Sequence, residues 1–128
     1  MSELCEVFEH ASVRNFGRAL RNALREKEAK TKDGKPIPGA QDYASLIELE
    51  WVENPKDFAE RLSKFLHRYN SFARSVRQKY GDSLPKGYPF IPSEEDLENI
   101  VKLAQNYGVK IVKSALIAHA LVKSEGGD

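Results

Sequence analysis

Residues 54–81 read NPKDFAERLSKFLHRYNSFARSVRQKYG, and this stretch decides the fold. Asn54 is a typical helix N-cap, Pro55 suits the first helical position, and Asp57 stands where a capping-box acid satisfies a free backbone N–H. Apolar residues then recur at spacings of three and four: Phe58, Ala59, Leu62, Phe65, Leu66, Tyr69, Phe72, Ala73, Val76 and Tyr80. At about 100° per residue they share one side of a helix. The stretch predicts a long helix, buried along one face, that ends at Gly81.

The polar side of this predicted helix is cationic. No acidic residue follows Glu60 until Asp82. The basic residues between them are Arg61, Lys64, Arg68, Arg74, Arg77 and Lys79. At about 1.5 Å per residue the helix is roughly 40 Å long, which is enough to run along several nucleotides. This side of the helix favours binding to a polyanion over catalysis.

A second basic row precedes the long helix. Ser12 is a candidate cap for a helix over residues 13–28, whose apolar face holds Val13, Phe16, Leu20 and Leu24. Four arginines spaced by four, three and four residues form one ridge beside that face: Arg14, Arg18, Arg21 and Arg25. The ridge is either a solvated flank, since arginine favours helices, or a row of contacts to phosphate.

The composition bounds the class of protein. Of the 128 residues, 30% are charged and 9% are aromatic, as in a folded soluble protein. We therefore expect one all-α domain over residues 1–128, a compact bundle of about five helices. The formal net charge of +1 conceals a segregation of charge. Residues 10–35 carry eight bases and three acids, whereas residues 36–60 carry one base and six acids.

The sequence disfavours both a disulfide within the chain and insertion into a membrane. Cys5 is the single cysteine, so it can form neither a disulfide within the chain nor a thiolate cluster for a metal. The start, MSELCEVFEH, lacks the basic residues and apolar run of a signal peptide, and no apolar segment reaches about 18 residues. We expect a cytoplasmic protein without a membrane partner.

Two loops rich in proline and glycine separate the remaining elements. They are residues 30–42, KTKDGKPIPGAQD, and residues 81–92, GDSLPKGYPFIP. The lysines of the first loop either extend the basic surface or are only solvated. Tyr88 and Phe90 of the second either fix the loop on the helices or stack on bases.

Further helices are predicted on both sides of the long one. A short helix is expected over residues 2–9 and another over residues 43–52. In the second, a lone Trp51 beside leucine and isoleucine favours a core position over base stacking. Ser93 and Asp96 predict a capping box for a helix that ends near Gly108.

The last predicted helix, residues 109–124, is apolar on nearly every side. Such a helix is surrounded by other elements. Either it lies at the centre of a monomeric bundle, or another protein chain covers part of it.

The titratable residues form no recognisable catalytic or metal site. His10, His67 and His119 have no partner at metal-binding spacing; His67 faces the polar side, whereas His119 is expected near the core. Four acids at one helix start are explained by capping and the helix dipole: Glu94, Glu95, Asp96 and Glu98. Neither a nucleophile motif nor a phosphate-binding glycine loop is present. We expect a protein that is not an enzyme and needs no cofactor or metal.

The two basic rows therefore carry the functional prediction. Arginine presents several donors to phosphate and stays charged at any working pH, which suits backbone contact without base readout. The predicted nucleic-acid-binding residues are Arg14, Arg18, Arg21, Arg25, Arg61, Lys64, Arg68, Arg74 and Arg77. If both rows emerge on one side of the bundle, they form one phosphate-facing track.

Two segments resemble a known family. ENPKDFAERLSKFLHRYNSFARSVRQ at 53–78 and EEDLENIVKLAQNYGVKIVKSALIAHALV at 94–122 are similar to the small helical subunits of CRISPR-Cas effector complexes. The likeness is greatest to the type I-A (archaeal Cascade) small subunit. SVRNFGRAL at 12–20 also resembles the start of type III small subunits, so the subtype stays open.

The resemblance implies a non-catalytic protein of antiviral defence. Copies of it would stack beside the backbone and large subunits of the complex and support the duplex of guide RNA and target DNA, or the displaced strand. Two alternatives remain open: a helical module that binds other proteins, and a free-standing DNA-binding regulator.

Overall fold

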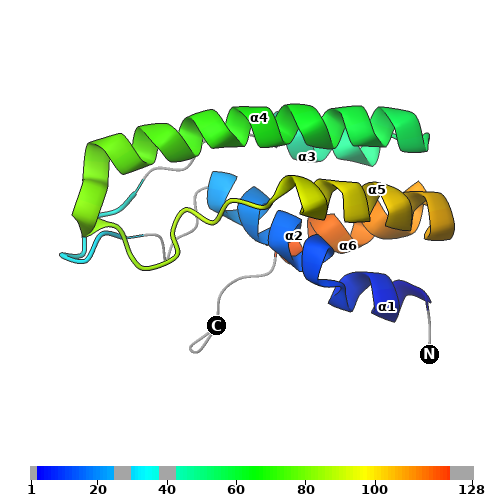
Figure 1. Ribbon diagram of the computed structural model, residues 1–128, viewed down its shortest axis with the longest axis horizontal. Helices are drawn as coiled ribbons and strands as arrows, with labels where there is room; N and C mark the ends of the chain where they lie inside the picture. Colours follow the sequence, from blue (N-terminus) through cyan, green and yellow to red (C-terminus); the bar gives the residue numbers. More distant parts are fainter. Residues whose placement is uncertain (1–2, 25–29, 38–42, 122–128) are drawn as a thin grey trace.

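A computed structural model describes residues 3–24, 30–37 and 43–121, and the side chains within them except those of 3–4 and 43–46. The described residues form six α-helices and one short 3-10 helix. They are α1 (Glu3–Glu9), α2 (Ala11–Ala23), α3 (Tyr43–Glu50), α4 (Pro55–Tyr80), η1 (Gly81–Ser83), α5 (Glu94–Tyr107) and α6 (Val109–Leu121). The expected all-α bundle is confirmed, with six helices rather than about five. Figure 1 shows α4 along one side and α2, α5 and α6 across from it.

The helix α4 follows the prediction from its sequence. The Asn54 side chain accepts hydrogen bonds from the backbone N–H groups of Lys56 at 2.8 Å and Asp57 at 3.3 Å. Gly81 ends the helix with φ of 52°, a value that glycine adopts at little cost. The buried residues are Phe58, Leu62, Phe65, Leu66, Tyr69, Ala73 and Val76. The apolar face therefore packs toward the other helices.

The helix α2 begins earlier than expected, because its N-cap is His10 and not Ser12. The Nδ1 atom of His10 accepts from the backbone N–H of Ser12 at 3.1 Å. The Ser12 side chain is buried, and its hydroxyl donates to Asp96 of α5 at 2.9 Å. Because the hydroxyl is used in this contact between helices, Ser12 does not cap α2. The predicted end at residue 28 lies outside the described residues.

The capping box at the start of α5 is confirmed and also joins α5 to α2. The Ser93 hydroxyl accepts from the Asp96 N–H at 3.1 Å, and the Asp96 carboxylate accepts from the Ser93 N–H at 3.0 Å. The same carboxylate accepts from Ser12 at 2.9 Å and from Asn15 at 3.1 Å. Burial alone raises the pKa of Asp96, but these hydrogen bonds outweigh it and hold the pKa below its ordinary value.

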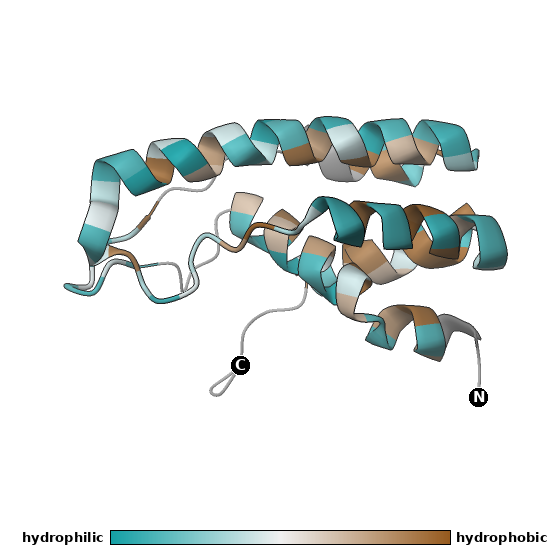
Figure 2. Ribbon diagram, in the orientation of Figure 1, coloured by the Kyte–Doolittle hydropathy of each residue, from teal (hydrophilic) through white to brown (hydrophobic). Residues whose placement is uncertain are grey.

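The helix α6 lies at the centre of the bundle and contacts α1, α2, α3 and α5. Figure 2 shows its predominantly apolar surface behind the more polar α5 and α2. Its closest approach is to α2, where a Cβ on Gly17 would lie 2.2 Å from the Cβ of His119. His119 stacks on Phe8 with ring centroids 4.0 Å apart and binds the Phe8 carbonyl at 2.8 Å, so its expected place near the core is confirmed.

Trp51 contradicts the core position predicted for it. Its residue surface is 79% exposed, whereas its neighbours Leu49 and Val52 are buried at 2% and 7%. The prediction was wrong because Leu49, in the last turn of α3, and Val52, in the turn that follows the helix, enter the core, which leaves the indole between them in solvent.

Candidate nucleic-acid interface

A small second core fixes both loops at the far end of α4. Ile37 and Val76 are buried there, and the partly buried side chains around them are Phe72, Tyr80, Leu84 and Tyr88. The backbone N–H of Lys32 donates to the Ser83 carbonyl at 2.7 Å, which joins the first loop to η1. Figure 1 shows the two loops meeting at the end of α4 away from α3. Segments some 50 residues apart in the sequence therefore share one surface.

Tyr69 attaches the second loop to the helices. Its hydroxyl donates to the Phe90 carbonyl at 2.6 Å and lies 3.2 Å from Asn22 Oδ1, which also accepts from the Phe90 N–H at 3.2 Å. Phe90 is thereby held at both backbone atoms between α4 and α2. The expectation that this loop is fixed on the bundle is met at Phe90, although base stacking there stays open.

Two arginines contribute to the electrostatic surroundings of Tyr69. Burial raises the pKa of the Tyr69 hydroxyl above its ordinary value, and the nearby Tyr88 adds to this shift. The positive charges of Arg18 and Arg77 act in the opposite direction. Arg18 also lies over the Phe90 ring, 4.9 Å from its centroid. Arg18 of α2 therefore contacts this loop, and Arg77 of α4 contributes to the electrostatic surroundings of the same tyrosine.

We define the basic pole as the exposed cations at this end of the molecule. Its members are Arg18, Lys30, Lys32, Lys35, Arg74, Arg77, Lys79 and Lys86. Residues 30–37 and 72–90 together carry seven bases and two acids, Asp33 and Asp82. The Asp33 carboxylate accepts a hydrogen bond from the Thr31 hydroxyl, which lowers the pKa of Asp33 and keeps it ionised. The surface is nevertheless strongly positive.

The basic row of α4 divides between two flanks. Arg77 lies nine residues after Arg68, which at 100° per residue places them about half a turn apart. Arg61, Lys64 and Arg68 share the flank that faces α3, and the Arg61 guanidinium pairs with the Glu48 carboxylate there at 3.4 Å. We expected these residues to join the arginines of α2 in one phosphate-facing track. The helix geometry instead places them on a different flank of α4 from Arg77. Arg74, three residues before Arg77, lies on the flank of Arg77, whereas Lys79, 18 residues after Arg61, lies in the same direction as Arg61.

The arginine ridge of α2 lies opposite its buried face. Arg14 and Arg18 are exposed and Arg21 is half-buried, as the spacing predicts. Arg25 lies outside the described residues. The ridge therefore supplies Arg18 directly to the basic pole and continues away from it through Arg14.

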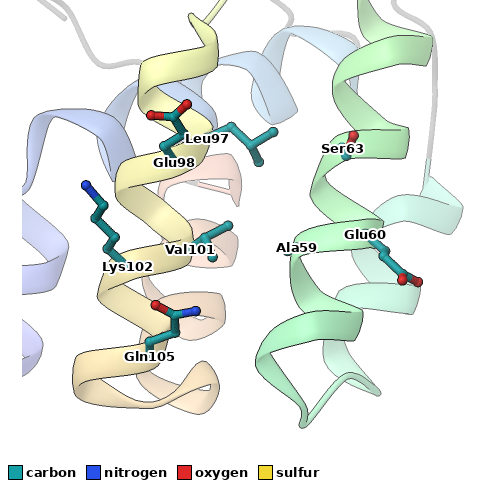
Figure 3. Close-up of a pocket in the computed structure, with 8 residues that line it drawn as sticks. All are labelled: Ala59, Glu60, Ser63, Leu97, Glu98, Val101, Lys102 and Gln105. Carbon is teal, nitrogen blue, oxygen red and sulfur yellow. The ribbon is translucent and has the colours of Figure 1, made fainter.

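A groove of about 530 Å³ lies between α4 and α5. Leu97 and Val101 of α5 reach toward Ala59 and Ser63 of α4 (Figure 3). Its other lining residues are Glu60, Glu98, Lys102 and Gln105. An apolar floor with two carboxylates does not suit phosphate, so the groove does not belong to the basic pole.

The described part of the chain holds neither a metal-binding group nor a membrane span. Its histidines, cysteine and acids do not gather in sets of three or more that could hold an ion. None of its helices combines the length and apolarity needed to cross a bilayer. His10 serves as a helix cap, and His67 is exposed on α4.

One comparison places the chain in a family. An uncharacterized protein of Archaeoglobus fulgidus is 43% identical over 130 residues, covering 100% of this chain and 92% of its own length. The two proteins belong to one family. The match spans every helix and both loops that form the basic pole. No family model and no solved structure matches the chain.

The sequence reasoning missed part of this surface. The lysines of both loops were not among the predicted binding residues, although Lys30, Lys32 and Lys35 stood out as basic. Their importance depends on Ile37 packing against Val76, a contact that no local pattern reveals. The available signal was the density of lysine in the first loop, Lys30, Lys32 and Lys35.

Proposed function

We propose that the protein binds the sugar-phosphate backbone of nucleic acid through the basic pole, without reading base sequence. The observation that carries this proposal is that the lysine-rich loop of residues 30–37 is bonded to η1, at the start of the second loop, while Arg18 of α2 lies over Phe90 of that second loop. Lysine and arginine neutralise phosphate and release counterions, which gives affinity that does not depend on sequence. Catalysis is not part of the proposal.

Aromatic side chains next to the cations favour a single strand as ligand. Arg18 covers Phe90, and the Lys79 ammonium lies 5.6 Å from the centroid of the Tyr80 ring. Partly exposed rings between cations are typical of surfaces on which unpaired bases stack while phosphates are neutralised. Single-stranded RNA or DNA is therefore the ligand we favour over a duplex.

The family resemblance extends the proposal to a biological setting. We propose a non-catalytic small subunit of a cytoplasmic CRISPR effector complex, in which the basic pole holds a guide–target duplex or a displaced strand. Co-expression with the guide-binding backbone subunits tests this setting. Co-purification of this chain with the guide-bearing complex supports it, and a complex that assembles fully and repeatedly without this chain contradicts it.

The basic pole itself is tested by charge reversal. In the variant Lys32→Glu, Lys35→Glu, Lys86→Glu, we expect at least a tenfold loss of affinity for a labelled 20-nucleotide single strand, measured by fluorescence anisotropy. These lysines are exposed, so far-ultraviolet dichroism of the variant should match that of the parent protein.

A matched control changes the same charge elsewhere. Lys56, Lys102 and Lys110 are also exposed but lie away from the two loops. Their triple replacement by glutamate should weaken binding less than threefold. Equal losses in both variants would show that net charge alone drives binding. A preference for one duplex sequence over unrelated competitors would instead favour the free-standing regulator.

A further inference from the structure

Trp51 is the most exposed large apolar residue in the described part of the chain. It is 79% exposed, and Ile47 one turn earlier is 57% exposed. Ile47 lies in the second half of α3 and Trp51 directly follows the helix, so the two exposed side chains are four residues apart at this helix end. Tryptophan of this exposure is uncommon on a free surface and frequent at the centre of protein interfaces.

The backbone beneath Trp51 is firmly held. The Lys113 ammonium of α6 donates to the Glu50 carbonyl at 2.7 Å and to the Val52 carbonyl at 3.1 Å. Leu49 and Val52 are buried on either side. The indole therefore stands on a fixed backbone and not on a frayed helix end. A side chain presented in this way loses little conformational entropy on binding, which favours affinity.

The surrounding charge selects the kind of partner. Residues 43–60 carry five acids and one base. Glu50 and Glu53 lie within two residues of Trp51, whereas the nearby Glu48 is paired with Arg61. Carboxylates repel phosphate, so this face disfavours nucleic acid. They also disfavour the α4–α5 groove of a second copy, whose lining carries two acids, Glu60 and Glu98, against one base, Lys102. The complementary surface is cationic around an apolar centre.

We propose that Ile47 and Trp51 form a docking site for a second protein whose apolar contact patch is bordered by lysine or arginine. The site lies at the opposite end of α4 from the basic pole (Figure 1). Its existence does not depend on nucleic-acid binding. The two ends together would let the chain hold a nucleic acid and a protein at the same time.

The single tryptophan of the chain provides a direct measurement. The probe is a synthetic amphipathic helical peptide with a leucine face bordered by lysines, added to the full chain. We expect a blue shift of Trp51 emission as the indole leaves water, and weaker binding as salt rises. A matched peptide with glutamate in place of lysine should give no shift.

Variants then locate the binding site of the labelled leucine–lysine peptide. Trp51→Ala should lower its affinity at least tenfold. Leu121→Ala is the matched control, since Leu121 is 62% exposed at the end of α6, and should change affinity less than twofold. The double replacement Glu50→Lys, Glu53→Lys should reverse the preference toward the glutamate peptide. Dichroism verifies that each variant is folded.

Three results would overturn the proposal. The first is unchanged peptide affinity in a folded Trp51→Ala variant. The second is an emission shift with a single-stranded oligonucleotide but not with the peptide, which would make Trp51 a base-stacking residue. The third is self-association in sedimentation that is lost in Trp51→Ala while the peptide does not bind, which would make a second copy the partner.

Discussion

Asp96 shows how one side chain joins two helices. Its carboxylate accepts from the Ser93 N–H of its own capping box and from Ser12 and Asn15 of α2. We expect Asp96→Ala to lower the free energy of unfolding by about 1–3 kcal/mol, because a cap and two tertiary hydrogen bonds are lost together. Urea denaturation at pH 7 measures the difference.

The effect of Asp96 should also depend on pH. Its pKa is lower in the folded state than the value of about 3.9 in an unfolded chain. Its stabilising contribution is therefore complete above pH 4–5 and is lost as pH falls through the folded pKa. The difference between parent and variant should shrink below about pH 4. The control Glu94→Ala removes a charge from the same turn and should cost less than about 1 kcal/mol. A pH-independent difference would contradict the role assigned to the carboxylate.

Gly17 is required for the close contact of α2 with α6. A helical Gly→Ala replacement normally stabilises, by about 0.5–1 kcal/mol. Here the added Cβ would lie 2.2 Å from the His119 Cβ, so we expect Gly17→Ala to destabilise by about 1–3 kcal/mol and lower the melting temperature. His119→Ala should not rescue it, because alanine keeps the clashing Cβ. Unchanged or increased stability in Gly17→Ala would contradict this packing.

At the scale of the element, α4 has two basic flanks that we expect to differ in their contribution to nucleic-acid binding. Arg77 acts with Arg18 on the surroundings of Tyr69, and Arg74 lies about one turn before Arg77, whereas Arg61 pairs with Glu48 beside the acidic residues of α3. We expect Arg74→Glu, Arg77→Glu to weaken single-strand binding several-fold more than Arg61→Glu, Lys64→Glu. Both pairs are exposed and change the same charge, so anisotropy titrations compare them directly. Equal losses would restore a continuous strip along the whole helix.

At the scale of the molecule, charge is separated along the length of α4. The basic pole lies where the helix ends, and five acids against one base lie in residues 43–60 at its start. A helix of 26 residues separates these regions by roughly 40 Å, well beyond the Debye length of about 8 Å at physiological salt. The two ends therefore act independently. A near-neutral total charge is compatible with strong local attraction for a polyanion.

Salt dependence tests this separation of charge. If the basic pole neutralises about five phosphates, the logarithm of the association constant should fall against the logarithm of salt concentration with a slope of about −3.5 for a single strand, or −4.5 for a duplex. Reversing Lys32, Lys35 and Lys86 should reduce the slope by about two. An unchanged slope would show that the phosphates bind elsewhere on the molecule.

Local patterns in the sequence determined the helices and the composition of their faces. The spacing of phenylalanine and leucine fixed the buried side of α4, Asn54 and Gly81 fixed its ends, and Ser93 with Asp96 fixed the start of α5. These features depend on residues within one or two turns of each other. Short-range geometry therefore suffices to predict them.

Only the tertiary structure decided which of these faces meet. The packing of Ile37 on Val76 brings the two loops to one end of α4, and the buried Ser12 leaves His10 to cap α2. Helix rotation separates Arg68 from Arg77, and the turn after α3 leaves Trp51 exposed. Each outcome depends on residues distant in sequence competing for the same space or the same hydrogen-bonding partner. That competition is settled when the helices pack, so no local pattern records it.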